Sequence, residues 1–338
     1  MKPADLIVSP GPHWHSGARK TTIAYHTMLA LVPAAVWGIT QYGLDAVRVI
    51  SLSIACAMLA EWGFRKLVRK PDSLADGTAA LSGLLLALIL PASTPWHMIL
   101  IGNVLGIVVG KECFGGLGAN PLNPVLVGYA ALRITTPWAG HLDFDLALIN
   151  YQLGYPLEFP LAVLRAKGAT ALGQFPLGQL FLGQQTGGIG AVGMVWLLIG
   201  GLYLVLRGFA PWRIPLAFLL GSFVTSGIFW LANGELHASP LFHLLTGNLM
   251  IGAFFLATDP SSSPVNRWPQ LIFGFACGLL AILLRAWSNY ADGVVFAILL
   301  MNLCVPLLDQ LTVKQRHAPR AAVPSALNPP ATEEGAAS

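Results

Sequence analysis

The stretch "TAALSGLLLALILPAST", residues 78–94, decides the fold. It runs from small residues into an apolar core and ends at a proline followed by Ser and Thr. The apolar part is shorter than the roughly 20 residues that a membrane-crossing helix needs. A broken helix survives at membrane depth only where other parts of the protein shelter its backbone polar groups. The stretch therefore predicts a broken or re-entrant helix inside a helical bundle.

The composition extends this prediction to the whole chain. Of 338 residues, 55% are hydrophobic and 10% are charged, whereas a soluble globular domain has about 25% charged residues. Apolar runs with charged or helix-breaking ends recur throughout. They lie at approximately residues 24–44, 46–64, 77–92, 96–112, 121–136, 190–207, 213–232, 241–257, 268–286 and 292–309. We therefore predict an all-α polytopic membrane protein with about ten transmembrane helices.

A second stretch, "LTGNLMIGAFFLATDPSSSP" at residues 245–264, repeats the order of small residues, apolar core, proline and Ser/Thr. Five spans separate the two stretches, so equivalent helices of two halves would run in opposite directions through the membrane. Two interpretations stay open. The chain contains two inverted five-helix repeats, or two helices of similar composition match by chance.

The distribution of Lys and Arg predicts the orientation, because cytoplasmic loops hold an excess of both. With both termini inside, 14 of the 19 Lys and Arg residues fall on the cytoplasmic side. We expect a cytoplasmic amino-terminal segment (1–23), a transmembrane bundle (24–312) and a disordered cytoplasmic tail (313–338). The loop 137–189 would then lie outside the cytoplasm. The first residues lack the charged-then-apolar pattern of a cleavable signal.

Several function classes find no support in the sequence. The formal charge of +4 is spread over short clusters without a basic face, which argues against nucleic-acid binding. The cysteines form no C-x-x-C pair and the histidines no H-E-x-x-H motif, so we assign no metal site. The sequence has no G-x-x-x-x-G-K-[ST] loop, which argues against nucleotide hydrolysis.

The first polar candidate is "GKECFGGLGANPLNPVLVG", residues 110–128, which contains Lys111, Glu112, Asn120 and Asn123 beside several glycines. Glycines break a helix, and a broken helix at membrane depth exposes backbone groups that can hold an ion or a polar ligand. The alternative is a cytoplasmic turn with a solvated Lys-Glu pair. On spacing alone the second interpretation has more support.

Asp259 in "LATDPSSSP", residues 256–264, is the second candidate. An ionisable group close to hydrocarbon is costly, so it indicates an ion pathway or a ligand site. The alternative is an aspartate that ends a helix in a turn, which the Asp-Pro pair favours. The third candidate, Thr170 in "KGATALGQF" at residues 167–175, has no chemical partner in the sequence, and a lone threonine is usually structural.

Five blocks of the sequence together resemble the D subunit of the Rnf complex, an ion-translocating electron-transfer complex. These blocks are "GKECFGGLGANPLNPVLVG", "GATALGQF" followed by "LFLGQQTGGIGAVG", "FAPWRIP", "FFLATDPSSSPV" and "ADGVVFAILLMNLCVPLLD". The same blocks occur in the B subunit of sodium-translocating NADH:quinone reductase. The resemblance covers residues from about 18 to 312, in order, and the length of the chain favours the Rnf subunit.

The resemblance implies a multi-pass subunit of the bacterial inner membrane that carries covalent FMN. In this family a separate flavin transferase joins the FMN phosphate to a threonine hydroxyl, here Thr170, next to the small residues Gly168 and Ala169. Family acceptor motifs commonly read Ser/Thr-Gly-Ala-Thr with an acidic residue upstream, whereas Lys167 precedes Gly168 here. Thr186 in "QQTGGIG" is therefore the reserve candidate.

The resemblance also implies partners and a second role. The partners are the Rnf subunits A, B, C, E and G, with ferredoxin and NAD as the soluble couple and membrane lipid around the bundle. Helix breaks at 110–124 and 256–264 suggest an ion path for Na⁺ or H⁺ that includes Lys111, Glu112, Asn120, Asn123 and Asp259. A second, non-covalent flavin such as riboflavin is a further expectation, for which the sequence identifies no pocket.

A redox subunit is not the only class of protein that the residues allow. Inverted halves also suit a stand-alone channel or transporter for a small polar solute without a redox cofactor. A structural membrane scaffold is the third class. A covalently attached flavin distinguishes the first class from the other two.

Overall fold

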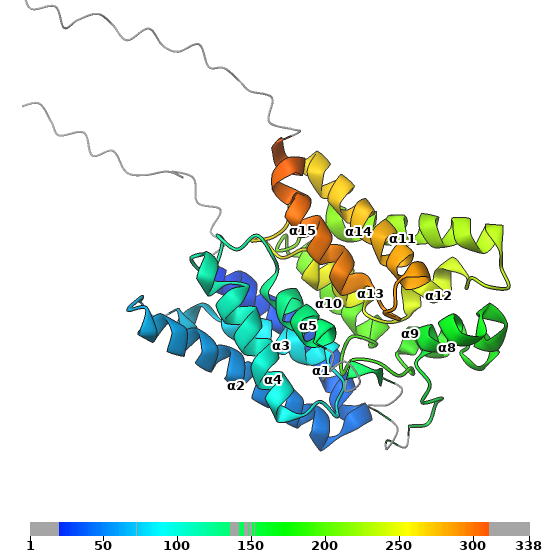
Figure 1. Ribbon diagram of the computed structural model, residues 1–338, viewed down its shortest axis with the longest axis horizontal. Coiled ribbons are helices and arrows are strands. Elements are labelled where there is room, and N and C mark those ends of the chain that lie inside the picture. The colour runs from blue at the N-terminus through cyan, green and yellow to red at the C-terminus, as the bar shows by residue number, and fades with distance from the viewer. Residues whose placement is uncertain are drawn as a thin grey trace, which may run out of the picture.

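The computed structural model describes residues 20–71, 73–135, 142–144, 148, 151 and 153–310, and this part of the chain contains helices and no strands. Figure 1 shows a bundle of helices in which the start of α1 and the end of α15 lie toward the upper left and α8 lies toward the lower right. Residues 1–19 of the predicted amino-terminal segment (1–23) and the whole predicted tail (313–338) lie outside the described residues, and residues 20–23 belong to the first helix. The all-α polytopic fold is confirmed.

The helices of the first half are α1 (Lys20–Tyr42), α2 (Leu44–Leu67), α3 (Thr78–Ile89), α4 (Trp96–Val104) and α5 (Pro124–Ile134). Those of the second half are α10 (Met194–Leu206), α11 (Arg213–Ala232), α12 (Pro240–Leu245), α13 (Leu249–Ile251), α14 (Arg267–Trp287) and α15 (Val294–Gln310). Each half contains a π-helical segment, η2 (Leu105–Val109) after α4 and η6 (Gly252–Leu256) after α13. Every expected span overlaps one of these helical segments.

Shorter helices connect these elements. They are the 3₁₀ segments η1 (Leu74–Asp76), η3 (Glu112–Phe114) and η5 (Ala169–Gln174) and the α-helices α8 (Pro160–Lys167) and α9 (Leu177–Leu182). The expected loop 137–189 therefore includes two helices among its described residues. Within the part of the chain that the structure describes, four apolar segments are long enough to cross a membrane: α1, the run Trp96–Phe114, α11 and α14. The apolar helices α3, α5, α10 and α15 are shorter.

The stretch 78–94 forms a broken helix, as predicted. Helix α3 ends at Ile89 before Pro91, which leaves backbone carbonyl groups without partners inside the helix. The amides of Ile189 and Gly190 donate to the carbonyl oxygens of Leu90 and Leu88, both at 3.0 Å. The "GGIG" segment, expected in an outer loop, is buried against the end of α3. It enters the bundle because the exposed carbonyls of α3 need donors.

The packing supports two inverted halves. In the first half α2 contacts α3 and α4, and in the second half α11 contacts α12 and α14. The two first helices, α1 and α10, pack against each other. Trp37 lies beside Trp196, whereas His26 near the start of α1 bonds Tyr203 near the end of α10. Equivalent helices therefore run antiparallel, as an inverted repeat requires.

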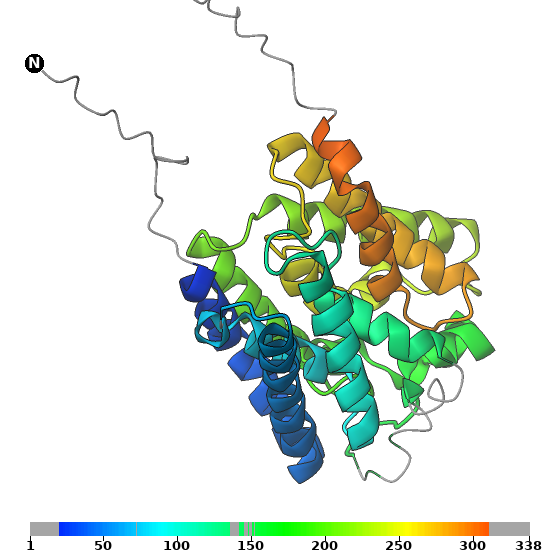
Figure 2. The same ribbon diagram turned by 60° about the vertical axis from the view of Figure 1, so that its left-hand side comes forward.

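A glycine permits the closest approach between the halves. A Cβ atom at Gly200 of α10 would lie 2.0 Å from the carbonyl oxygen of Ala30 in α1. Only a residue without a side chain fits this contact, as in other close-packed membrane helices. Figure 2 shows the same arrangement of the helices turned by 60°. Buried apolar side chains from both halves form the core between them.

Candidate functional site

The structure contains two cavities that hold sequence-predicted residues. The Thr170 cavity has a volume of about 530 Å³ and is lined by residues of α8, α11, α12 and α14. The Asp259 cavity has a volume of about 270 Å³ and lies between the two halves. Phe209 and Ala210, just before α11, line the Asp259 cavity, and Phe229 in α11 lines the Thr170 cavity. At 1.5 Å per residue, the helix separates the two by about 24 Å.

Thr170 lies on an exposed turn at the wall of its cavity. Helix α8 ends at Lys167, and Gly168 adopts a φ of 76°, a conformation that favours glycine. The chain then enters η5, where the Ala169 amide donates to the carbonyl oxygen of Glu235 at 2.9 Å. Thr170 follows with an exposed side chain. Its hydroxyl is thus accessible to an external enzyme.

An ionic clamp holds this turn in place. The Glu158 carboxylate accepts hydrogen bonds from Lys167 Nζ at 3.2 Å and from Gln174 Nε2 at 2.9 Å. These groups flank η5 on both sides. The hydrogen bond from Gln174 and the Lys167 ammonium lower the pKa of Glu158 from its ordinary value. The carboxylate is therefore charged and bonded at neutral pH.

Thr186, the reserve candidate, has a different environment. Its side chain is fully buried, and its hydroxyl donates to the carbonyl oxygen of Pro156 at 3.1 Å. A hydroxyl in this position is accessible neither to solvent nor to an enzyme. Of the two threonines, only Thr170 has the exposure that a modification from outside requires.

Two walls of the Thr170 cavity carry polar groups. Arg165 in α8 bonds the uncharged Asn289 at 3.3 Å, so its positive charge has no carboxylate there. Arg285 in α14 is buried and donates to Asp292 at 3.1 Å and to the carbonyl oxygens of His243 at 2.7 Å and Thr246 at 2.9 Å. Leu164, Phe229 and Ile282 add apolar surface. The cavity combines the exposed positive charge of Arg165 with an interior of apolar and buried polar side chains.

The Asp259 cavity brings together candidates from both halves. Lys111 and Asn123 of the first half line it with Asp259 of the second. The Asn123 side chain caps α5 by accepting from the Val125 amide at 2.9 Å, and it donates to the Leu256 carbonyl oxygen across the halves at 3.1 Å. The two polar stretches, more than 130 positions apart in sequence, therefore meet as one polar surface.

A chain of hydrogen bonds connects Asn120 to Asp259. Asn120 Nδ2 donates to Ser261 Oγ at 3.0 Å, and Ser261 Oγ donates to Asp259 Oδ2 at 2.6 Å. Ser262 donates to the same carboxylate oxygen at 2.9 Å. Asp259 lies among the turns that follow η6, three residues after the helical segment ends at Leu256, which is close to the alternative interpretation. It also faces the cavity, so the two interpretations are compatible.

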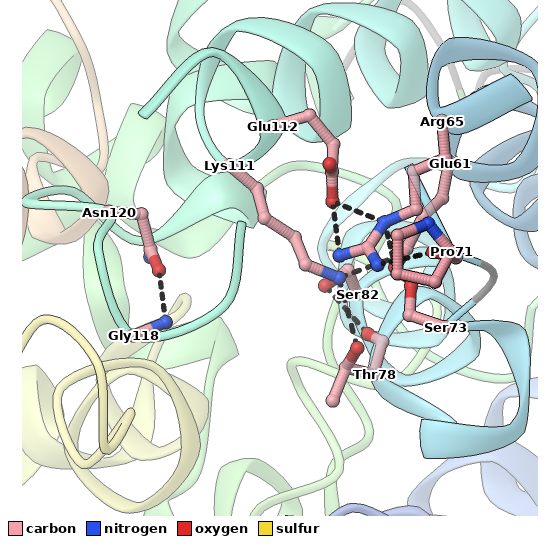
Figure 3. A network of polar contacts seen from close by, with 10 residues as sticks. All are labelled: Glu61, Arg65, Pro71, Ser73, Thr78, Ser82, Lys111, Glu112, Gly118 and Asn120. Carbon is pink, nitrogen blue, oxygen red and sulfur yellow. Dashed lines mark hydrogen bonds and ion pairs between the residues drawn. The ribbon is translucent and has the colours of Figure 1, made fainter. Parts of the chain in front are cut away.

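Glu61, Arg65, Lys111 and Glu112 form a buried charge cluster (Figure 3). Lys111 Nζ lies 2.7 Å from Glu61 Oε2 and donates to Thr78 Oγ1 at 2.9 Å. Arg65 Nε and Nη2 each donate to Glu112 Oε1 at 3.1 Å. Ser73 donates to Glu61. The cluster joins α2 and the start of α3 to the turn after η2.

The interpretation of Lys111 and Glu112 as a solvated pair is wrong. Both side chains are 1% exposed or less, and each pairs with a residue of α2 rather than with its neighbour. The turn folds inward because Gly115 and Gly116, with φ of 111° and 103°, reverse the chain directly after Glu112. Buried charges require partners, and α2 supplies them.

The structure places three further residues, Glu61, Arg285 and His243, in these sites, and none of them is a candidate in the sequence analysis. Glu61 and Arg285 are charged residues near helix ends, yet both are buried. His243 lines the Thr170 cavity and is 6% exposed. A charged residue within an apolar span, as at Glu61, is the sequence feature that could have identified such a residue. His243 carried no signal, because its spacing to other polar residues is irregular.

The helices and the two sites define a class: an integral membrane protein with inverted halves and two separate cavities, each lined in part by polar side chains. A model of the NQR2, RnfD, RnfE family matches residues 7–318. The chain therefore belongs to this family.

Similar proteins carry related names. The chain is 37% identical to the D subunit of the Na⁺-translocating ferredoxin:NAD⁺ oxidoreductase complex of Acetobacterium woodii, over 92% of the chain and 95% of that relative. It is 35% identical to the D subunit of the proton-translocating ferredoxin:NAD⁺ oxidoreductase complex of Clostridium ljungdahlii, over 91% and 94%. It is 36% identical to the D subunit of the ion-translocating oxidoreductase complex of Sodalis glossinidius, over 93% of the chain and 99% of that relative.

Proposed function

We propose that this chain is the membrane electron-transfer subunit of an ion-translocating ferredoxin:NAD⁺ oxidoreductase complex of the Rnf type, with FMN covalently bound at Thr170. Two relatives carry this complex in their names, one with Na⁺ and one with H⁺. The proposal accordingly covers translocation of Na⁺ or H⁺. The chain acts as one subunit of a translocase, because its described residues supply no site for the soluble donor or acceptor.

One observation carries the flavin assignment: Thr170 is exposed beside a cavity, whereas Thr186 is buried. The residues fit FMN. Arg165 offers a positive charge to the phosphate, and the apolar wall formed by Leu164, Phe229 and Ile282 suits a flat ring. When bound, FMN supplies electron transfer, and the protein supplies position and electrostatic environment. A separate flavin transferase activates the Thr170 hydroxyl, since none of the contacts described above gives it a base.

The proposal is tested by fluorescence of the denatured chain in a gel, after co-expression with a flavin transferase. We expect a flavin signal in the wild type and in Thr186→Val, and none in Thr170→Val. Mass spectrometry of the peptide that contains Thr170 should show FMN attached through the phosphate. A wild-type chain without bound flavin would refute the assignment and favour a stand-alone channel or transporter for a small polar solute.

We further propose that Lys111, Glu112, Asn120, Asn123 and Asp259 belong to an ion path through the Asp259 cavity. The cavity and its hydrogen-bonded chain join both halves at a point where a π-helical segment interrupts each half. Asp259→Asn should lower the number of ions moved per electron in vesicles. Asp45→Asn, at a half-exposed carboxylate, is the control. Unchanged ion coupling in Asp259→Asn would contradict the path.

The same cavity is our proposed site for the second, non-covalent flavin such as riboflavin. Its walls are mostly apolar, and Asn123 and Ser82 contribute hydrogen-bonding groups. Flavin released from the purified protein by acid should be identified as riboflavin by chromatography. Leu85→Trp, which fills the cavity, should abolish its release without affecting the flavin at Thr170.

We propose that the complex lies in the bacterial inner membrane, with both termini of this chain in the cytoplasm and the Thr170 cavity on the other side. The uneven distribution of Lys and Arg supports this orientation. Rnf subunits A, B, C, E and G are the proposed partners, together with lipid around the bundle. A cysteine-labelling assay from each side of the membrane, with Thr312→Cys and Gln174→Cys in a cysteine-free chain, tests the orientation.

A further inference from the structure

The imidazole of His243 is the polar group in the Thr170 cavity that has no assigned role. The residue is 6% exposed and lines the cavity from α12. Its Nδ1 atom is fully buried without a hydrogen-bond partner among the described residues. A neutral imidazole carries one N–H donor and one acceptor nitrogen. Because Nδ1 is enclosed by the protein, a ligand in the cavity can reach only the other ring nitrogen, Nε2, and a tautomer with its proton on Nε2 leaves no buried N–H group unbonded at Nδ1.

The surroundings of His243 fix its position. Arg285 donates to the backbone oxygens of His243 and Thr246, and it is itself paired with Asp292. Asp292 also accepts from the Asn248 amide at 2.6 Å, which ties down the turn after α12. The backbone of His243 is therefore fixed by hydrogen bonds, and its side chain lines the same cavity as Thr170.

We propose that His243 donates a hydrogen bond to the pyrimidine edge of the flavin ring and thereby positions the ring and raises its reduction potential. This inference rests on the proposed attachment of FMN at Thr170. The flavin ring offers oxygen and nitrogen acceptors along this edge, where the reduced form holds negative charge. A donor at that edge stabilises the reduced flavin more than the oxidised one. His243 is thus a positioning residue for the ring, and Arg285 fixes the histidine.

The test compares His243→Leu and His243→Gln with the wild type, using His97→Leu as the control, because His97 is not among the lining residues of either cavity. In-gel fluorescence reports attachment, and a redox titration of the native protein reports the potential. We expect His243→Leu to retain the covalent flavin and to shift its oxidised-to-reduced ratio about tenfold toward the oxidised form, which is about 59 mV for a one-electron couple. His243→Gln keeps a hydrogen-bond donor, so its reduction potential should lie close to that of the wild type.

The outcomes separate this inference from the proposed function. A wild type without in-gel fluorescence would remove the attachment and the inference together. A fluorescent His243→Leu protein with the wild-type potential would overturn the inference alone. If His243→Leu does not fold, the fluorescence anisotropy of the tethered flavin in the wild type tests the hydrogen bond instead. A ring bonded to His243 tumbles with the whole protein, and a freely rotating ring refutes the bond.

Discussion

Removing one partner of the Glu61–Lys111 pair should destabilise the fold far more than removing both. Both side chains are 1% exposed, and Lys111 Nζ has Glu61 as its carboxylate partner at 2.7 Å. Lys111→Met leaves the Glu61 charge buried. Breaking a buried pair in this way typically costs about 3–5 kcal/mol, whereas replacing both partners by apolar groups is often nearly neutral.

The contacts of Glu61 place the expected cost at the lower end of that range. With Lys111 removed, Arg65 Nε still lies 3.6 Å from Glu61 Oε1, and Ser73 still donates to the carboxylate. We therefore expect about 3 kcal/mol for Lys111→Met, of which the second substitution Glu61→Gln recovers about 2 kcal/mol. The coupling between the two positions should thus be favourable and large.

The assay is unfolding in mixed micelles with increasing sodium dodecyl sulfate, followed by the fluorescence of the 10 tryptophans. Lys66→Met is the matched control, because Lys66 is exposed and its main contact is the Trp62 ring at 4.7 Å. Its loss should cost about 0.5–1 kcal/mol. Equal destabilisation by Lys111→Met and Lys66→Met, or a double variant whose cost is the sum of the single ones, would refute the reasoning.

Two further predictions concern the packing and the Thr170 turn. Gly200→Ala should destabilise the protein by about 1–3 kcal/mol in the same assay, because its Cβ would meet the Ala30 carbonyl oxygen. Gly63→Ala, with open space around it, should instead stabilise by about 0.5–1 kcal/mol, and similar effects of both would contradict the packing. Because the folded-state pKa of Glu158 is lowered, its clamp is complete above the ordinary carboxyl value and is lost as the pH falls through the lowered pKa. As the pH falls through the lowered pKa of Glu158, hydrogen exchange of the amides of residues 169–174, corrected for its intrinsic pH dependence, should become faster. Glu158→Gln should remove this pH dependence.

The helices could be predicted from the sequence because their signal is local. In lipid every backbone amide and carbonyl must be satisfied within its own segment or a sheltering neighbour, so apolar runs that end at prolines, glycines or charges mark helices. The expected span 213–232 has the same bounds as α11, and the span 24–44 matches α1 with shifts of a few residues. The internal match between 78–94 and 245–264 likewise agreed with the antiparallel packing of α1 and α10.

The partners of the polar residues could not be predicted, because they lie far apart in the chain. Glu61 and Lys111 are 50 positions apart, and Asn120 and Ser261 are 141 apart. The local sequence around Lys111 suits a solvated turn equally well. For Thr170, the residues alone favoured a structural threonine and only the family resemblance implied attachment of FMN, while the cavity beside it is lined by α8 and by residues from three other helical regions.

The sequence by itself determined that the chain is a bundle of membrane helices, where the helices break and which residues carry charge. Only the tertiary structure decided which of those charges are buried, which threonine is exposed and which polar groups share a cavity. The physical reason is that helix formation in a membrane follows from backbone hydrogen bonding along one segment. Burial and pairing of a side chain instead depend on which distant helices pack against it.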